Sequence, residues 1–117
     1  MRVEYINPFV ESAYSVLTEV LQAEVSRGEL YLKSSAAPVL GVAAIIGLAG
    51  DVEGRVLLDM DKPTAIAVAS GMLQSMDMDP VEEMNEMGRA TISELANMIT
   101  GQAVTKLHNL GFKFDLT

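Results

Sequence analysis

Apolar residues recur at helical spacing in the first quarter of the chain. Asn7 followed by Pro8 is a favourable helix start, because asparagine can cap free N–H groups and proline fits the first helical position. Gly28 suits the position just past a helix end, where a left-handed backbone is common. The pattern therefore predicts a helix between Asn7 and Gly28, whose apolar face contains Phe9, Ala13, Val16, Leu17, Val20 and Val25.

The pattern next changes to features that indicate strands. Glu29–Ser34 alternates apolar and polar residues, which predicts a short strand. Val39–Met60 holds two apolar runs separated by Gly50–Gly54, a stretch rich in turn residues. We therefore expect Val39–Met60 to form a β-hairpin.

Helical spacing returns after the hairpin. Pro63–Met76 is predicted as a helix that a proline opens. The sequence DPVE at Asp79–Glu82 has the arrangement of a capping box, so a long helix is predicted from there to about Asn109, with Gly111 as its stop. Phe112–Leu116 alternates again and is predicted as a strand.

The order of these elements predicts an α/β domain of the α+β type. We expect two layers, with the helices packed on one face of a mainly antiparallel sheet. A chain of 117 residues suits a single domain covering residues 1–117. Half of the residues are hydrophobic but few are aromatic, so the core must be built from aliphatic side chains and methionine.

Charge and composition exclude several classes of function. The net charge of −8 disfavours nucleic acid and anionic membranes as partners, because phosphate groups need clustered lysine and arginine. The absence of cysteine excludes disulfides, thiol nucleophiles and zinc–thiolate sites. No apolar run resembles a secretory signal or a membrane span, so we expect a soluble, cytoplasmic protein.

The long predicted helix carries polar groups that do not serve its packing. Glu94 and Asn97 are three residues apart and are therefore neighbours on the helix surface. They lie about 100° or more from the centre of the predicted buried stripe, and Ala90 and Gly101 share their sector. The predicted stripe contains Met84, Gly88, Thr91, Leu95, Met98 and Ile99, with Ile92 and Ala103 on its shoulder.

Two interpretations of this sector remain open on spacing alone. An exposed carboxylate and amide three residues apart are commonly just solvated. A glycine inside a helix costs up to about 1 kcal/mol relative to alanine, so Gly101 needs a packing or contact reason. Small residues at 90 and 101 would let another surface approach the helix closely.

The stretch ISELANMITGQAVTKL resembles the E-x-x-N helix of the CheC/CheX/FliY family of chemotaxis phosphatases. Upstream, IIGLAGDVEGRVLLDM followed by KPTAIAVASGML resembles that family's strand–glycine turn–strand–helix segment, and LGFKFDLT resembles the start of its next strand. Members similar to CheC carry E-x-x-N on two pseudo-repeated helices. Here the corresponding first helix has Glu11 and Tyr14, so the single site resembles the CheX arrangement.

The resemblance implies a phosphatase that acts on the aspartyl phosphate of a CheY-like receiver domain of a response regulator. Asn97 is then the residue that orients the attacking water, and Glu94 the one that binds a lysine of the receiver. Ala90 and Gly101 are their small neighbours in the substrate-binding surface. The family implies no cofactor or metal on this chain, and Mg²⁺ is expected on the receiver.

Family members usually continue for several strands beyond the position of Thr117. We therefore expect a shortened or truncated version that lacks C-terminal strands. It is expected to form a homodimer, with or without strand exchange, that covers its sheet edge. The alternative function is a catalytically inactive module of the same fold that binds a receiver or dimerises. Intact Glu94 and Asn97 favour the enzyme, and the early end of the chain favours the module.

Overall fold

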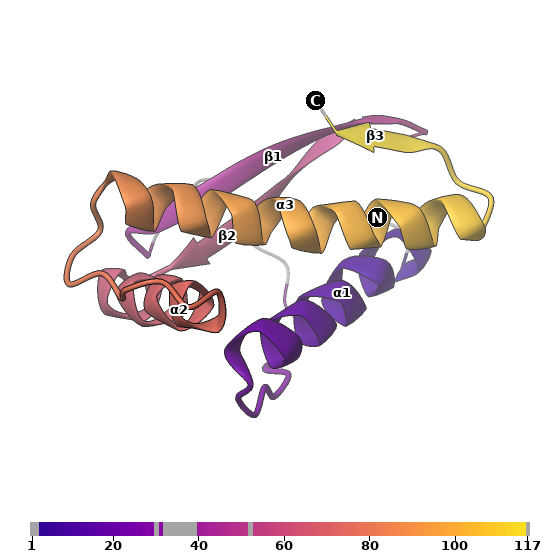
Figure 1. Ribbon diagram of the computed structural model, residues 1–117. Coiled ribbons are helices and arrows are strands. Elements are labelled where there is room, and N and C mark those ends of the chain that lie inside the picture. Colours follow the sequence, from indigo (N-terminus) through magenta and orange to yellow (C-terminus); the bar gives the residue numbers. More distant parts are fainter. Residues whose placement is uncertain (1–2, 30, 32–39, 52, 117) are drawn as a thin grey trace.

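The structure is a computed structural model that describes residues 3–29, 31, 40–51 and 53–116. It has two layers, with the helices on one face of a three-stranded sheet (Figure 1). This confirms the predicted fold class. The elements in chain order are α1 (Val3–Leu21), β1 (Val42–Gly50), β2 (Gly54–Met60), α2 (Lys62–Ser75), α3 (Glu86–Asn109) and β3 (Phe114–Leu116).

The sheet is antiparallel, with the strand order β2-β1-β3. The strands β1 and β2 pair from Val42↔Met60 to Leu48↔Gly54, which confirms the predicted hairpin. The strand β3 pairs with the end of β1, and Gly50 lies opposite Phe114. The predicted strand at Glu29–Ser34 falls mostly outside the described residues; Glu29 and Tyr31, which are described, are not in a strand.

Helix α3 is the central element of the helical layer. It contacts α1, α2 and the sheet, and Figure 1 shows it running across the sheet with α1 and α2 beneath it. Its buried side chains share one broad face and enter all three hydrophobic clusters of the core. Those fully or nearly fully buried include Ile92, Leu95, Ala96, Ile99, Ala103 and Leu107.

The ends of α2 and α3 follow local capping rules. The Asp61 carboxylate caps α2 by accepting a 2.8 Å hydrogen bond from the Thr64 N–H, and hydrogen bonding to Thr64 lowers the pKa of Asp61. At the end of α3, Gly111 has a φ of +94°. The Gly111 N–H donates to the His108 carbonyl and the Phe112 N–H to the Leu107 carbonyl, which is a Schellman motif. The predicted stop at Gly111 is confirmed.

The predicted limits of the first helix are wrong. The helix begins at Val3, before Asn7, and contains Pro8 in its second turn. Pro8 lacks the backbone N–H that would bond to the carbonyl four residues earlier, so the helix accommodates one missing hydrogen bond in its second turn. The helix ends at Leu21, because Gln22 takes a left-handed φ of 50°. Gly28 is therefore not its stop.

The predicted start of the long helix is also wrong. Helix α3 begins at Glu86, where the Asn85 side chain accepts a hydrogen bond from the Gly88 N–H. The capping box at Asp79–Glu82 is not used as a cap. Instead, Val81 packs against the core and exchanges hydrogen bonds with the Ser70 hydroxyl, and Met84 is buried. Tertiary packing of this connection outweighs its local helix signal.

Candidate functional site

Helix α3 presents Glu94, Asn97 and Ala90 to solvent, as predicted. All three side chains are exposed, and Gly101 is half-buried in the same sector of the helix. They are held there because the opposite face of α3 is fixed in the core by residues such as Leu95. At about 100° per residue, Ala90, Asn97 and Gly101 lie within about 40° of one another around the axis. The structure thus brings the four predicted residues together on one open face.

The buried stripe of α3 differs from the predicted one at Met98. This side chain is 36% exposed and lies beside the Glu94–Asn97 face, instead of in the core. The actual buried face is displaced towards Ala96 and Thr100, which are buried. The displacement follows from packing on two sides, because α3 is covered both by α1 and by the sheet.

In the part of the chain that the structure describes, Gly101 has no packing reason for being glycine. A Cβ atom built on Gly101 would meet no described atom within 4 Å outside its own helix backbone. By contrast, a Cβ on Gly71 would lie 2.8 Å from Leu21, and one on Gly88 would lie 3.0 Å from the Met84 sulfur. Packing thus explains Gly71 and Gly88 but leaves Gly101 without an explanation inside the molecule.

The polar groups of the Glu94–Asn97 face are available to an external partner. Neither the Glu94 carboxylate nor the Asn97 amide has a side-chain hydrogen-bond partner within the described part of the chain. A carboxamide can both donate and accept hydrogen bonds, and it does so without titrating. A carboxylate one turn away accepts hydrogen bonds or pairs with a cation. This combination can hold a water molecule and a cationic side chain next to each other.

The first helix does not duplicate this arrangement. The Glu11 carboxylate lies 3.4 Å from the Lys106 Nζ, where it forms an exposed ion pair between α1 and α3. Tyr14, at the position that corresponds to Asn97, is 53% exposed. The first helix therefore offers neither an amide nor an unpaired carboxylate at these positions, so the Glu94–Asn97 pair has no counterpart at positions 11 and 14.

His108 is occupied by a structural contact. Its Nε2 lies 2.7 Å from the Phe114 carbonyl oxygen, which links the end of α3 to β3. It is eleven residues from Asn97, which corresponds to about 16 Å along a helix axis. His108 thus belongs to the junction of α3 and β3 and not to the Glu94–Asn97 face.

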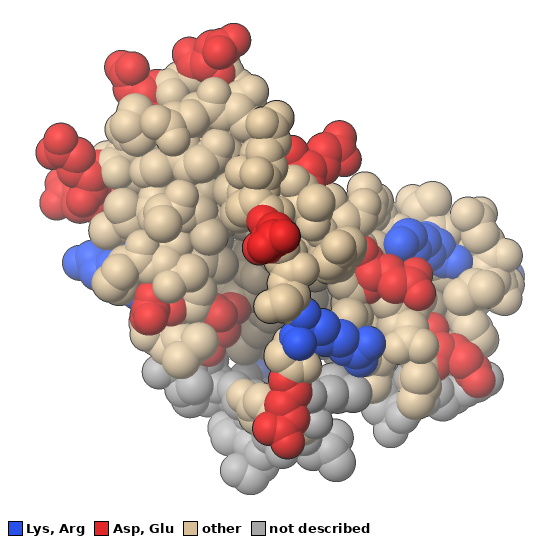
Figure 2. Space-filling view, turned by 90° about the horizontal axis from the view of Figure 1, so that it is seen from below, with Lys and Arg blue, Asp and Glu red and all other residues tan. Residues whose placement is uncertain are grey.

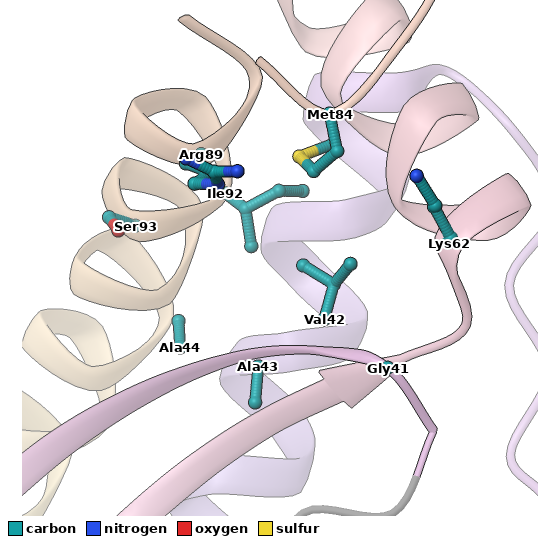
Figure 3. A pocket seen from close by; sticks show the side chains of 9 residues that line it. All are labelled: Gly41, Val42, Ala43, Ala44, Lys62, Met84, Arg89, Ile92 and Ser93. Atoms are coloured by element: carbon teal, nitrogen blue, oxygen red, sulfur yellow. The ribbon is translucent and has the colours of Figure 1, made fainter. Parts of the chain in front are cut away.

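The sequence interpretation missed a hollow at the start of α3, shown in Figure 3. Its volume is about 520 Å³, and it lies between the first turns of α2 and α3 and the start of β1. Arg89 and Lys62 stand on opposite sides of it, with Ile92 and Val42 between them. No local sequence signal could have found it, because the two basic residues are far apart in the chain and neither belongs to a motif.

The described residues contain neither a cluster of metal-ligating side chains nor a membrane-spanning helix. They contain no group of three or more histidine, cysteine, aspartate or glutamate side chains that could hold a metal ion. Within the same residues, no helix combines the length and the apolar character needed to cross a bilayer.

Comparison with known proteins assigns the chain to a family. The sequence profile described as chemotaxis phosphatase CheX matches residues 42–117. A curated relative, the CheY-P phosphatase CheX of Thermotoga maritima, is 28% identical over 117 residues, which are 100% of this chain and 74% of that protein.

Solved structures agree with this assignment. The chain is similar to a protein in the CheX–CheY–BeF3–Mg²⁺ complex from Borrelia burgdorferi, with 40% identity, a TM-score of 0.81 and coverage of 99% of this chain and 74% of that one. It is also similar to a CheC-like superfamily protein from Shewanella sp. PV-4, with 28% identity, a TM-score of 0.87 and coverage of 100% and 74%. The resemblance noted in the sequence is confirmed, and the chain belongs to the chemotaxis phosphatase CheX family.

Proposed function

We propose that this chain hydrolyses the aspartyl phosphate of a CheY-like receiver domain, with Asn97 and Glu94 as its catalytic and receiver-binding residues. The observation that carries the proposal is the exposed, unpartnered Glu94–Asn97 pair on α3, framed by Ala90 and Gly101. Two relatives support the substrate: one is named CheY-P phosphatase CheX, and another belongs to a complex with CheY.

Asn97 acts by positioning water. An acyl phosphate already has a good leaving group, so catalysis mainly requires a water molecule held in line with the bond that breaks. The Asn97 amide accepts one hydrogen bond from that water and can donate another to its surroundings. Attack on phosphorus breaks the bond to the aspartyl oxygen, and the products are inorganic phosphate and a free carboxylate on the receiver.

Glu94 acts by binding the receiver. Its carboxylate is exposed and one turn from Asn97, so it can pair with a lysine of the docked receiver while Asn97 reaches the phosphoryl group. A charge-assisted hydrogen bond of this kind contributes about 1.5–3 kcal/mol to binding. Ala90 and Gly101 permit the approach because they add almost no side-chain bulk.

Mg²⁺ belongs to the receiver in this proposal. The complex from Borrelia burgdorferi contains Mg²⁺ together with CheY and BeF3. In this proposal the acidic groups that bind Mg²⁺ come from the receiver, and the present chain contributes the Glu94–Asn97 pair.

The test is the decay of a phosphorylated receiver. A CheY-like receiver is charged with acetyl phosphate, the excess reagent is removed, and phosphate loss is followed with and without this protein. The proposal expects a rate that rises with protein concentration. Binding of the receiver without faster decay would instead identify the inactive receiver-binding module.

We also propose that this single CheX-like domain, residues 1–117, forms a homodimer. In the described sheet, β2 and β3 have a neighbour on one side only, and such edges are suited to pairing with another copy. Sedimentation equilibrium should then give a mass near twice the 12.6 kDa of one chain. A mass of one chain at micromolar concentration would exclude the dimer.

A further inference from the structure

The hollow at the start of α3 carries two basic groups, and neither has an acidic partner among the described residues. The side chains of Lys62 and Arg89 are exposed, and among the described residues neither has an ion pair or a hydrogen bond. The nearest acidic neighbour in the sequence, Asp61, directs its carboxylate to the Thr64 N–H. Glu86, in the first turn of α3, is exposed to solvent. The two cations are thus available to an anion that enters from outside.

The floor of the hollow is apolar, which narrows the kind of anion that fits. It is formed by Val42 and Ala44 of β1, Met84 and Ile92, and Figure 3 shows Val42 and Ile92 facing each other across it. An ionised group on a short aliphatic stem matches this combination, because the stem contacts the floor while the charge stays at the rim. Aspartate and glutamate side chains have this form.

The hollow lies within reach of a partner docked on Asn97. Arg89, Ser93 and Asn97 follow one another at intervals of four residues along one side of α3, and Arg89 and Ser93 line the hollow. Eight residues of helix separate Arg89 from Asn97 by about 12 Å. A partner that buries about 800 Å² on this chain covers a disc about 16 Å in radius. A receiver centred on Asn97 therefore extends over the hollow.

We propose that this hollow receives an acidic side chain from the surface of the docked receiver, with Lys62 and Arg89 as its two contacts. The proposal rests on the proposed function for the identity of the partner. It assigns to α3 a second contact besides the Glu94–Asn97 pair, placed about two turns towards the N-terminus. Two contacts on one helix fix the direction in which the receiver lies along α3, which one contact cannot do.

The contact would offset the negative charge of the chain where an acidic receiver docks. The chain has a net charge of −8, and in the face drawn in Figure 2 the acidic side chains are dispersed and outnumber the basic ones. Such a molecule repels an acidic partner at long range. At physiological ionic strength charges are screened beyond about 8 Å, so the charges at the contact itself decide the attraction. Lys62 and Arg89 supply positive charge at the edge of the docking surface.

The test measures binding after charge reversal at matched positions. Arg89→Glu, Lys62→Glu and Arg55→Glu each change the net charge by the same amount, and all three residues are exposed. Arg55 lies on β2 and does not line the hollow, so it is the control. Affinity is measured for a receiver loaded with BeF3 and Mg²⁺, at about 50 mM and about 300 mM NaCl, and circular dichroism checks the fold of each variant.

The expected result is a loss of affinity of about tenfold for Arg89→Glu and for Lys62→Glu at low salt, shrinking at high salt, and less than threefold for Arg55→Glu. Equal losses for all three variants would overturn this inference while leaving the proposed function intact. A wild-type protein that does not bind the loaded receiver would overturn both. Binding that depends on Lys62 and Arg89 without faster phosphate loss would support the contact and reject only the catalytic proposal.

Discussion

The Asn97 amide is exposed on α3 and has no side-chain partner in the described part of the chain, so its replacement should leave the fold unchanged. Asn97→Ala removes the group proposed to orient water, and misplacing a reactant costs about 100-fold in rate. We expect decay of the phosphorylated receiver to slow by about that factor, with an unchanged melting temperature. Asn97→Asp keeps an acceptor for the water but replaces the amide donor with a second, negatively charged oxygen beside the phosphoryl group, so it should also be slow. Wild-type rates in both variants would remove Asn97 from the mechanism.

Also at the scale of single residues, substitution of Glu94 tests receiver binding separately from the chemical step. If it pairs with a receiver lysine, Glu94→Ala should raise KM for the phosphorylated receiver by about 10- to 100-fold, the equivalent of about 1.5–3 kcal/mol. The rate at saturating receiver should fall much less, because Asn97 is still present. Glu94→Gln keeps the size and loses the charge. An unchanged KM in both variants would contradict the proposed role.

At the scale of the helix, substitution of Gly101 should change the stability of α3 and its binding to the receiver in opposite directions. Space around a Cβ atom is open there, so Gly101→Ala should stabilise α3 by about 0.5–1 kcal/mol and raise the melting temperature by a few degrees. If the receiver approaches the helix closely at this point, the same substitution should weaken receiver binding severalfold. Calorimetry and a binding titration measure the two effects on one variant.

Ser15→Ala is the matched control for that experiment. Ser15 is exposed on α1, outside the helix that carries Asn97, and alanine there also raises helix propensity. It should not alter receiver affinity. If Gly101→Ala binds as well as Ser15→Ala does, Gly101 is not part of the docking surface, and its presence in the helix is left without a cause.

At the scale of the whole molecule, Gly50 joins the sheet to the end of α3. Its φ is +138°, and a Cβ atom there would overlap the Lys113 carbonyl, where β3 pairs with β1. Gly50→Ala should displace β3 and open the cluster of Val104, Leu107 and Phe114. We expect a loss of about 2–4 kcal/mol in the free energy of unfolding, measured with urea.

Gly54→Ala is the control for the sheet. Gly54 begins β2, its φ lies outside the left-handed range, and a Cβ atom there would meet nothing within 4 Å. Its stability should stay within about 0.5 kcal/mol of the wild type. A Gly50→Ala variant as stable as Gly54→Ala would show that the junction of β1 and β3 can relax without cost.

Local patterns in the chain were sufficient for much of this molecule. The hairpin, the helical face with Glu94 and Asn97 outside, and the stop at Gly111 all follow from periodicity and turn chemistry, which depend on residues close together in sequence. Periodicity alone therefore predicts that the face with Glu94 and Asn97 is exposed, but it does not predict the role of that face. The family assignment rested on the same short stretches of sequence.

Contacts between distant segments settled the rest. Helix α3 starts at Glu86 and not at Asp79 because Val81 and Met84 are held by the core. Met98 is exposed because α1 and the sheet cover α3 on two sides and displace its buried face towards Ala96 and Thr100. The meeting of Lys62 and Arg89 depends on how α2 and α3 sit on β1. Such placements come from packing among all the elements together, and no periodicity within one segment encodes them.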